Sequence, residues 1–253
     1  GDNQRQFFVP RGFAHGFLVL SDTATFFYKC DNFYNKESEG GIIYNDKSIN
    51  IDWSFSSDKL IISEKDKGMY DALNKGITLA SGDVIGILNA DDMLASSTII
   101  STIVTKFKVT GAEGVYGNLN YIDADHPQKI IRNWISKQHQ INDFNKGWMP
   151  AHPTLYVKNS LFKTYGNYSL NYGTAGDYEL MLRFLYRHQI KAVYLNQLIV
   201  NMRVGGMSNA SIKQRYWAFI NDYRAAKNNQ ISSPLWAILL KKMGKISQYL
   251  HRN

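Results

Sequence analysis

The sequence contains a single cysteine, Cys30, and no long apolar run. One cysteine excludes an intramolecular disulfide and is typical of proteins in a reducing cytosol. A helix that spans a membrane needs about 18 or more consecutive apolar residues, so no such segment is expected. A signal-peptide pattern is also missing. Because the chain begins with Gly1 rather than Met, we expect its natural start to be missing or a leader to have been removed.

Acidic residues are scarce near the carboxyl end, where positive charge gathers. Residues 212–253 contain eight Lys or Arg and one acid, Asp222, while the whole chain has a net charge of +8. Apolar residues recur on one side of a predicted helix over 234–252, and lysines flank them. This helix can lie on an anionic membrane surface, and packing on the domain with solvated lysines is an equal alternative. We expect a cytoplasmic protein that can touch the inner face of the membrane, without a nucleic-acid partner.

The remaining composition is that of a globular chain, with 44% apolar and 20% charged residues. The sequence pattern changes twice, which predicts three segments: a β-type fragment at 1–62, an α/β domain at 63–210 and a basic helical tail at 211–253. Within the first segment, short β-type runs are separated by Gly, Asp, Asn and Ser. This pattern predicts an antiparallel β fragment of a sandwich or jelly roll.

Residues 61–94 have the pattern of a strand, a loop, a helix, a second strand and an acidic turn. Apolar residues between 69 and 80 recur at helical spacing, and Gly82 stands where a left-handed residue often ends a helix. Residues 84–88 form a short apolar run without polar alternation, which predicts a strand covered on both faces. The order of these elements favours the α/β class.

Two adjacent carboxylates, Asp91 and Asp92, follow this strand. The carboxyl ends of strands are the edge where open α/β sheets bind ligands. Carboxylates this close repel each other unless a cation lies between them, and oxygen ligands suit Mg²⁺ or Mn²⁺. A divalent ion here could hold a diphosphate, with Asn89 beside it. The alternative is that both acids are turn and cap residues before Ser96 and Ser97.

A second acidic stretch lies at 172–187, where an apolar stripe predicts a helix with Asp177 in its first turn. The helix dipole favours a carboxylate at this position, and such a group could take a proton from an acceptor hydroxyl. The alternative is a capping acid without chemistry. Glu179 is either a supporting partner of Asp177 or another first-turn acid.

Two further segments could contact phosphate. His152 lies in a loop between Pro150 and Pro153, and on spacing alone it is a fixed loop histidine. Backbone N–H groups of the Gly-rich turn at 205–209 could cradle a phosphate, and Arg203 could add charge. A plain loop is an equal interpretation of this turn.

The words SEKDKGMYDALNKGI, LNADD and AGDYELMLR occur in order and resemble the core of a family-two, GT-A-type glycosyltransferase. The resemblance implies that Asp91 and Asp92 bind Mn²⁺ or Mg²⁺ and that Asp177 is the catalytic base. It also implies that His152 lies near the metal and the diphosphate, and that the turn with Arg203 closes over the donor phosphates.

On the nucleotide side, Asp66, Asp71 and Asn74 are the candidate binding residues, together with Asn89. The first two strands of the family, which hold the nucleotide, have no counterpart upstream of Ser63. The resemblance therefore implies a partial GT-A sheet, which is Rossmann-like, with flanking helices.

A different resemblance covers residues 6–66. The words VPRGFAHGF and INIDW, with the residues between them, are similar to the carboxyl half of dTDP-4-dehydrorhamnose 3,5-epimerase, a cupin-fold enzyme. The resemblance implies that Tyr28 acts as an acid, that His15 lies in the substrate cavity and that Asp66 orients a catalytic histidine. That histidine and the phosphate-binding arginines belong to the preceding half of the family. The word SEKD occurs in both families. The change from the epimerase resemblance to the glycosyltransferase resemblance therefore falls within this word.

These expectations combine into an inverting, metal-dependent glycosyltransferase. The donor would be a UDP- or dTDP-linked sugar, and the acceptor a saccharide or a lipid-linked sugar in surface polysaccharide synthesis. An epimerase represented by its carboxyl half is one alternative. A catalytically inactive hybrid, which lacks the nucleotide-binding strands, is another.

Overall fold

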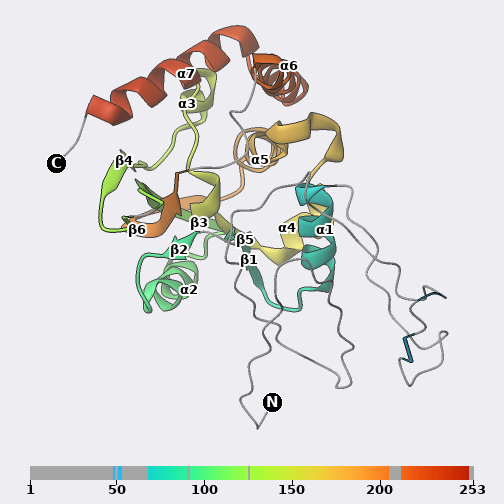
Figure 1. Cartoon of the computed structure of the whole chain (residues 1–253), viewed down its shortest axis with the longest axis vertical. Helices are drawn as coiled ribbons and strands as arrows, with labels where there is room; N and C mark the ends of the chain where they lie inside the picture. The colour runs from blue at the N-terminus through green and yellow to red at the C-terminus, as the bar shows by residue number, and fades with distance from the viewer. Residues whose placement is uncertain are drawn as a thin grey trace. The chain divides into compact units, whose positions relative to one another are not determined.

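The computed structural model describes residues 48, 51–52, 68–89, 92–124, 126–204 and 212–250, with the backbone alone at 212–214 and 245–250. The chain divides into two compact units, Gly1–Glu64 and Lys65–Asn253. The second unit contains the α/β region and both tail helices (Figure 1). Apart from residues 48, 51 and 52, the predicted β fragment lies outside the described residues. Several predicted site residues lie outside them too: His15, Tyr28, Asp66, Asp91 and the turn at 205–209.

Helices and strands alternate through the second unit, so the predicted α/β class is confirmed. Their bounds are α1 (Met69–Leu79), β1 (Val84–Gly86), β2 (Met93–Leu94), α2 (Ile99–Thr110), β3 (Gly114–Ile122), β4 (Ile130–Trp134), α3 (Ile141–Asn145), η3 (His152–Thr154), β5 (Tyr156–Lys158), α4 (Asn159–Tyr165), η4 (Leu170–Ala175), α5 (Gly176–Met181), η5 (Leu182–Arg187), β6 (Ala192–Arg203), α6 (Ile212–Asn228) and α7 (Pro234–Leu250).

The strands form a mixed sheet in the order β1-β5-β3-β6-β2, and β4 also pairs with β3. The central strands β3 and β6 are parallel, and Ile122 pairs with Arg203 at their carboxyl ends. The other pairings are antiparallel. The parallel pair therefore brings the ends of two strands to one edge of the sheet, the geometry that creates a ligand site in α/β proteins.

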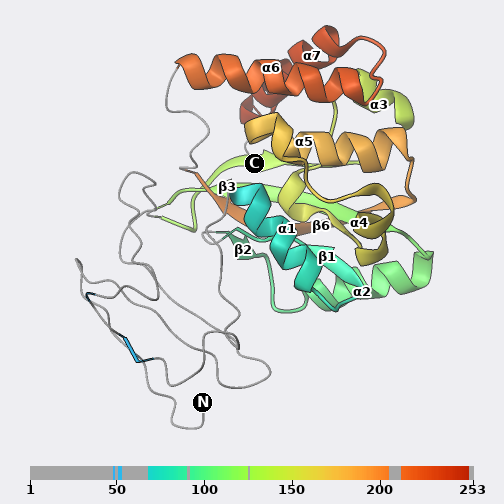
Figure 2. The same cartoon turned by 90° about the vertical axis from the view of Figure 1, so that its right-hand side faces the viewer.

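Alternation along β3 separates two hydrophobic clusters. Val115 and Leu119 pack with α2, whereas Tyr116 packs with the helices of the opposite face. Successive side chains of a strand point to opposite faces, so this largely buried strand supplies both clusters. Figure 2 shows α2 on one side of the sheet and α5 on the other, with α6 and α7 beyond α5.

Two local expectations around β1 are wrong. The strand is shorter than 84–88 and not covered on both faces, because Val84 and Ile85 are only partly buried and Leu88 is exposed. β1 pairs with β5 alone among the strands that the structure describes, so one of its sides has no described neighbour. The preceding helix ends at Leu79, where Ala80 turns to an extended backbone (φ −69°, ψ 125°), so a left-handed Gly82 is not used.

The tail helix α7 packs on the domain through small and apolar residues. Ala237 and Ile238 are fully buried. Lys241 also points inward: its Nζ lies 3.1 Å from Asp222 Oδ2 and 3.5 Å from the centre of the Tyr178 ring. The expectation that all the tail lysines are solvated is therefore wrong for Lys241. In the part of the chain that is described, no helix combines the length and the hydropathy needed to cross a bilayer.

The docking of α7 should depend on Gly147, which follows α3. Its φ of +76° is unfavourable for residues with a Cβ, and a Cβ there would lie 2.2 Å from the Ala237 carbonyl oxygen and 2.5 Å from the Lys241 backbone nitrogen. We expect Gly147→Ala to lower the free energy of unfolding by at least about 2 kcal/mol, measured by urea unfolding.

Gly76→Ala provides the control for this prediction. Gly76 lies inside α1, and a Cβ there would meet no atom within 4 Å. This substitution should be neutral or stabilising by about 0.5–1 kcal/mol, because alanine favours the helix interior. Equal stabilities of the two variants would contradict the proposed contact.

Candidate active site

Asp92 lies at the sheet edge where β3 and β6 end. It directly precedes β2, and Met93 of β2 pairs with Asn201 of β6, so Asp92 lies at the end of β6 that Arg203 terminates. Its side chain is 7% exposed. Asn89 Nδ2 donates to Asp92 Oδ2 at 2.8 Å, and Asp92 N donates to the Asn89 carbonyl oxygen at 3.1 Å. A closed turn therefore fixes this carboxylate.

Few potential metal ligands surround Asp92 in the described part of the chain. No group of three or more His, Cys, Asp and Glu side chains is placed to hold a metal within the described ranges, which do not include Asp91. A site of one or two carboxylates is typical of Mg²⁺ bound mainly by substrate phosphates and water, not by a closed protein cage. The oriented oxygen of Asp92 fits that kind of donor set.

The second acid, Asp177, is partly exposed in the first turn of α5. Its Oδ1 accepts a hydrogen bond from Tyr178 N at 2.7 Å and lies 3.3 Å from Tyr70 OH. Asp177 N in turn donates to Tyr70 OH at 3.1 Å. The phenol is equally close to the Thr174 carbonyl oxygen, at 3.3 Å, so two acceptors compete for its proton. Tyr70 thus contacts both the main chain and the carboxylate of Asp177.

Tyr168 and His152 lie beside this carboxylate. The Tyr70 and Tyr168 rings stack with centroids 5.4 Å apart, and Tyr168 OH lies 2.7 Å from His152 Nε2. Burial raises the pKa of both phenols, and the negative charge of Asp177 raises it further. Burial lowers the pKa of His152, against an opposing effect of Asp177. At neutral pH the cluster therefore contains protonated phenols and an uncharged imidazole.

The structure gives Asn74 and Asp71 local partners. Asn74 Nδ2 donates to the Tyr168 carbonyl oxygen at 2.8 Å, and Tyr168 N donates to Asn74 Oδ1 at 2.9 Å. Asp71 Oδ2 forms an ion pair with Lys75 at 3.5 Å. Asn74 therefore fixes the loop that carries Tyr168. The nucleotide contacts expected for both residues stay predictions.

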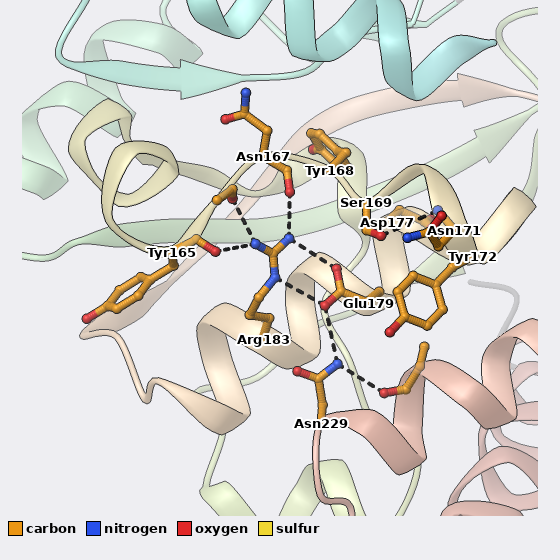
Figure 3. A network of polar contacts seen from close by, with 12 residues as sticks. Tyr165, Asn167, Tyr168, Ser169, Asn171, Tyr172, Asp177, Glu179, Arg183 and Asn229 are labelled. Carbon is orange, nitrogen blue, oxygen red and sulfur yellow. Dashed lines mark hydrogen bonds and ion pairs between the residues drawn. The ribbon is translucent and has the colours of Figure 1, made fainter. Parts of the chain in front are cut away.

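Glu179 and Arg183 form a buried ion pair one helical turn apart (Figure 3). Arg183 Nε donates to Glu179 Oε1 at 3.1 Å, and Nη2 donates to Oε2 at 3.0 Å. The guanidinium also donates to three consecutive carbonyl oxygens, those of Tyr165, Gly166 and Asn167. A planar group with five donors can make this set of bonds, whereas an ammonium cannot.

This ion pair connects the site to the tail. The three carbonyls that Arg183 binds immediately precede Tyr168, so the pair holds the loop that supplies the partner of His152. On its other side, Asn229 Nδ2 lies 3.4 Å from Glu179 Oε1 and 3.0 Å from the Ala225 carbonyl oxygen (Figure 3). The partners given for Glu179 are Arg183 and Asn229, so its role as a supporting partner of Asp177 stays a prediction.

The sequence missed Tyr70, Tyr168 and Arg183. Tyr70 and Arg183 lie inside the recognised words, and the i, i+4 spacing of Glu179 and Arg183 could have indicated the ion pair. The stacking of Tyr70 on Tyr168 had no local signal, because the two residues are far apart in the sequence.

Asp92 lies at the edge of a mixed α/β sheet, and Asp177 lies at the start of α5. Comparisons with known proteins match two families to separate segments of this chain. Residues 54–167 match the family model "Glycosyl transferase family 2". Residues 1–73 match the model "dTDP-4-dehydrorhamnose 3,5-epimerase". Both resemblances are thus confirmed as segments of one chain. The two matches overlap at 54–73, which contains the shared word SEKD.

Individual relatives show the same division. The chain is 54% identical to dTDP-4-dehydrorhamnose 3,5-epimerase of Escherichia coli (strain K12) over 69 residues, which cover 27% of this chain and 37% of the relative. For the Methanothermobacter thermautotrophicus epimerase, the identity is 52% over 67 residues, 26% of this chain and 36% of the relative. A "PGL/p-HBAD biosynthesis glycosyltransferase" of Mycobacterium bovis (strain BCG) is 24% identical over 165 residues, 63% of this chain and 60% of the relative.

The chain therefore spans about a third of the length of the epimerases and 60% of this glycosyltransferase.

Removal of one partner from the Glu179–Arg183 pair should destabilise the second unit strongly. The two side chains are 7% and 13% exposed, and Glu179→Gln leaves the guanidinium buried without its counter-charge. We expect a loss of about 3–5 kcal/mol in the free energy of unfolding, measured by urea denaturation. The matched control is Lys75→Gln, which breaks the more exposed Asp71–Lys75 pair and should cost less than about 1 kcal/mol. Similar losses for both variants would refute the structural role of the buried pair.

His152 should make stability depend on pH. Its folded pKa lies below the ordinary value of 6.5, so the unfolded chain binds more protons as the pH falls below about 6.5. The contribution of His152 to the free energy of unfolding is fully present above that pH and should decline toward pH 5.5. His152→Asn should reduce this slope in urea unfolding at pH 7.5, 6.5 and 5.5. His126→Asn, on an exposed loop, controls for the loss of a histidine and should retain the wild-type slope. An unchanged slope in His152→Asn would exclude this residue as the source.

Proposed function

We propose that the second unit is the catalytic part of an inverting, metal-dependent glycosyltransferase. The observation that carries the proposal is the arrangement of Asp177, whose partly exposed carboxylate is oriented by Tyr178 N and Tyr70 OH at the start of α5. The match of residues 54–167 to glycosyl transferase family 2 supports it. The substrates would be a UDP- or dTDP-linked sugar and a hydroxyl group of a saccharide or lipid-linked acceptor.

In the proposed step, Asp177 accepts the proton of the acceptor hydroxyl. The acceptor oxygen forms a bond to the anomeric carbon while the bond from that carbon to the diphosphate oxygen breaks. The electron pair of the broken bond leaves with the nucleoside diphosphate, and attack from the opposite face inverts the anomeric centre. A positioned general base contributes about 10²–10⁴-fold to such a reaction. The uncharged His152 nearby leaves Asp177 as the charged group that attracts the proton.

The leaving diphosphate would lie at the edge marked by Asp92. Asp91 and Asp92 would hold Mn²⁺ or Mg²⁺ there, and Asn89 orients the Asp92 carboxylate. When bound, the ion would neutralise the charge that develops on the diphosphate. Arg203, at the end of β6, would add positive charge on the same side. Asp66, Asp71 and Asn74 would contribute to the nucleotide side.

The proposed class of acceptor is inferred from the names of the matched proteins. One relative is named for PGL/p-HBAD biosynthesis, and the first segment matches an enzyme that acts on a dTDP-linked sugar. Both facts favour a role in building a surface saccharide or a glycolipid.

A second candidate follows from the match of residues 1–73, where the identity to the Escherichia coli epimerase reaches 54%. In this alternative the chain acts on a dTDP-4-keto sugar, without a metal. It would exchange protons for deuterium at the carbons beside the keto group, which a glycosyltransferase would not do.

Two substitutions test the transferase roles separately. We expect wild-type protein to bind UDP or dTDP in the presence of Mn²⁺ by isothermal titration calorimetry, and Asp92→Ala to lose the metal-dependent part. Asp177→Asn should retain this binding but lower the release of nucleoside diphosphate from a mixture of UDP- and dTDP-sugars by about 10²-fold or more. Binding tests the donor site, and turnover tests the base.

Asp83→Asn is the control, because it removes a carboxylate from an exposed position before β1. It should bind and react like the wild type. A chain that binds no nucleotide with or without Mn²⁺ would be an inactive hybrid. Solvent deuterium in a recovered dTDP-4-keto sugar would instead favour the epimerase.

A further inference from the structure

Helix α7 is apolar on two opposite sides. One side packs on the domain through Ala237 and Ile238, which are fully buried. The opposite side, here called the outer face, presents apolar side chains that are 41–63% exposed: Leu235, Trp236, Leu239 and Met243. Residues i, i+4 and i+8 share one side of a helix, so three of these four form a continuous stripe beside Trp236. A contiguous exposed apolar surface of this kind often marks a site that binds another protein or a membrane.

The outer face continues onto α6. A pocket of about 270 Å³ lies between the two helices. It is lined by Tyr223 of α6, by residues 233–236 at the start of α7 and by Leu239. Further along α6, Tyr216 and Trp217 are 59% and 53% exposed. The exposed surface of the helix pair therefore combines aliphatic side chains with aromatic ones.

The sequence of the two helices has an excess of positive charge. Residues 212–250 contain seven Lys or Arg and a single acid, Asp222. Asp222 pairs with the inward-pointing Lys241, so the acid is already neutralised within the domain. Lys242 is exposed, and its Nζ lies 4.7 Å from the centre of the Phe219 ring. A second copy of the chain would bring like charges together at this surface, which disfavours self-association.

We propose that the outer face of α7, with the neighbouring aromatic residues of α6, docks onto the surface of an anionic phospholipid bilayer. A helix that lies in the plane of a membrane buries its apolar side in the headgroup region, and Trp and Tyr favour that depth. Each Lys or Arg near an anionic surface adds to the attraction. The helix pair supplies all three features on its solvent side. This docking does not depend on the proposed catalytic step.

Vesicle sedimentation tests the proposal. The whole chain should sediment with vesicles of phosphatidylcholine containing about a third phosphatidylglycerol, and little with phosphatidylcholine alone. High salt should weaken this binding, because screening reduces the attraction between exposed charges. The triple variant Leu235→Ser, Trp236→Ser, Leu239→Ser should bind the anionic vesicles at least about tenfold more weakly, because it removes the apolar contact.

A matched variant controls for the loss of exposed apolar side chains in general. Leu79 and Val109 are 85% and 79% exposed on α1 and α2, and Leu79→Ser with Val109→Ser should retain wild-type vesicle binding. Circular dichroism melting should show both variants folded. Vesicle binding that is unchanged in the triple variant, or equal on neutral and anionic vesicles, would overturn the proposal. A concentration-dependent dimer that the triple variant abolishes, without vesicle binding, would assign the surface to a second copy instead.

Discussion

The ion pair between Glu179 and Arg183 is the contact on which the arrangement of the candidate site depends. Arg183 binds three consecutive carbonyl oxygens before Tyr168, and Glu179 is also reached by Asn229 after α6. One pair of charges therefore connects the helix that carries the candidate base, the loop beside it and the tail. Buried ion pairs do not always stabilise a fold, because desolvation opposes them. Here the remaining donors of the guanidinium are used by backbone acceptors, so the pair also defines the conformation of the loop.

The two candidate carboxylates, Asp177 and Asp92, have different surroundings. Asp177 lies beside two buried phenols and an imidazole that burial keeps uncharged. Asp92 is held by Asn89 at a different place, the edge where β3 and β6 end. In the proposed reaction, one carboxylate would lie near the acceptor hydroxyl and the other near the diphosphate, at opposite ends of the glycosyl transfer. The two separate acidic positions support the proposed transferase over a single acid–base centre.

The chain joins segments that match two different families. The epimerase match and the glycosyltransferase match overlap at residues 54–73, and the division into compact units falls in the same stretch, after Glu64. The described part of the second unit has a sheet whose strand β1 has a described neighbour on one side only. Its tail helices are packed on the domain and yet expose apolar and basic side chains. Packing and exposure are therefore combined in α7, where the sequence pattern had suggested a choice between them.

The sequence by itself determined the class of the fold, the helical tail and both family resemblances. These depend on local periodicity and on short words, which a linear chain displays directly. Only the tertiary structure decided that Tyr70 contacts Asp177, that Asn74 binds the backbone of Tyr168 and that Lys241 points inward to Asp222. Those contacts join residues that are distant in the sequence, or depend on which side of a helix packs on the domain. No local pattern encodes either, because both follow from how the helices fill the space on the sheet.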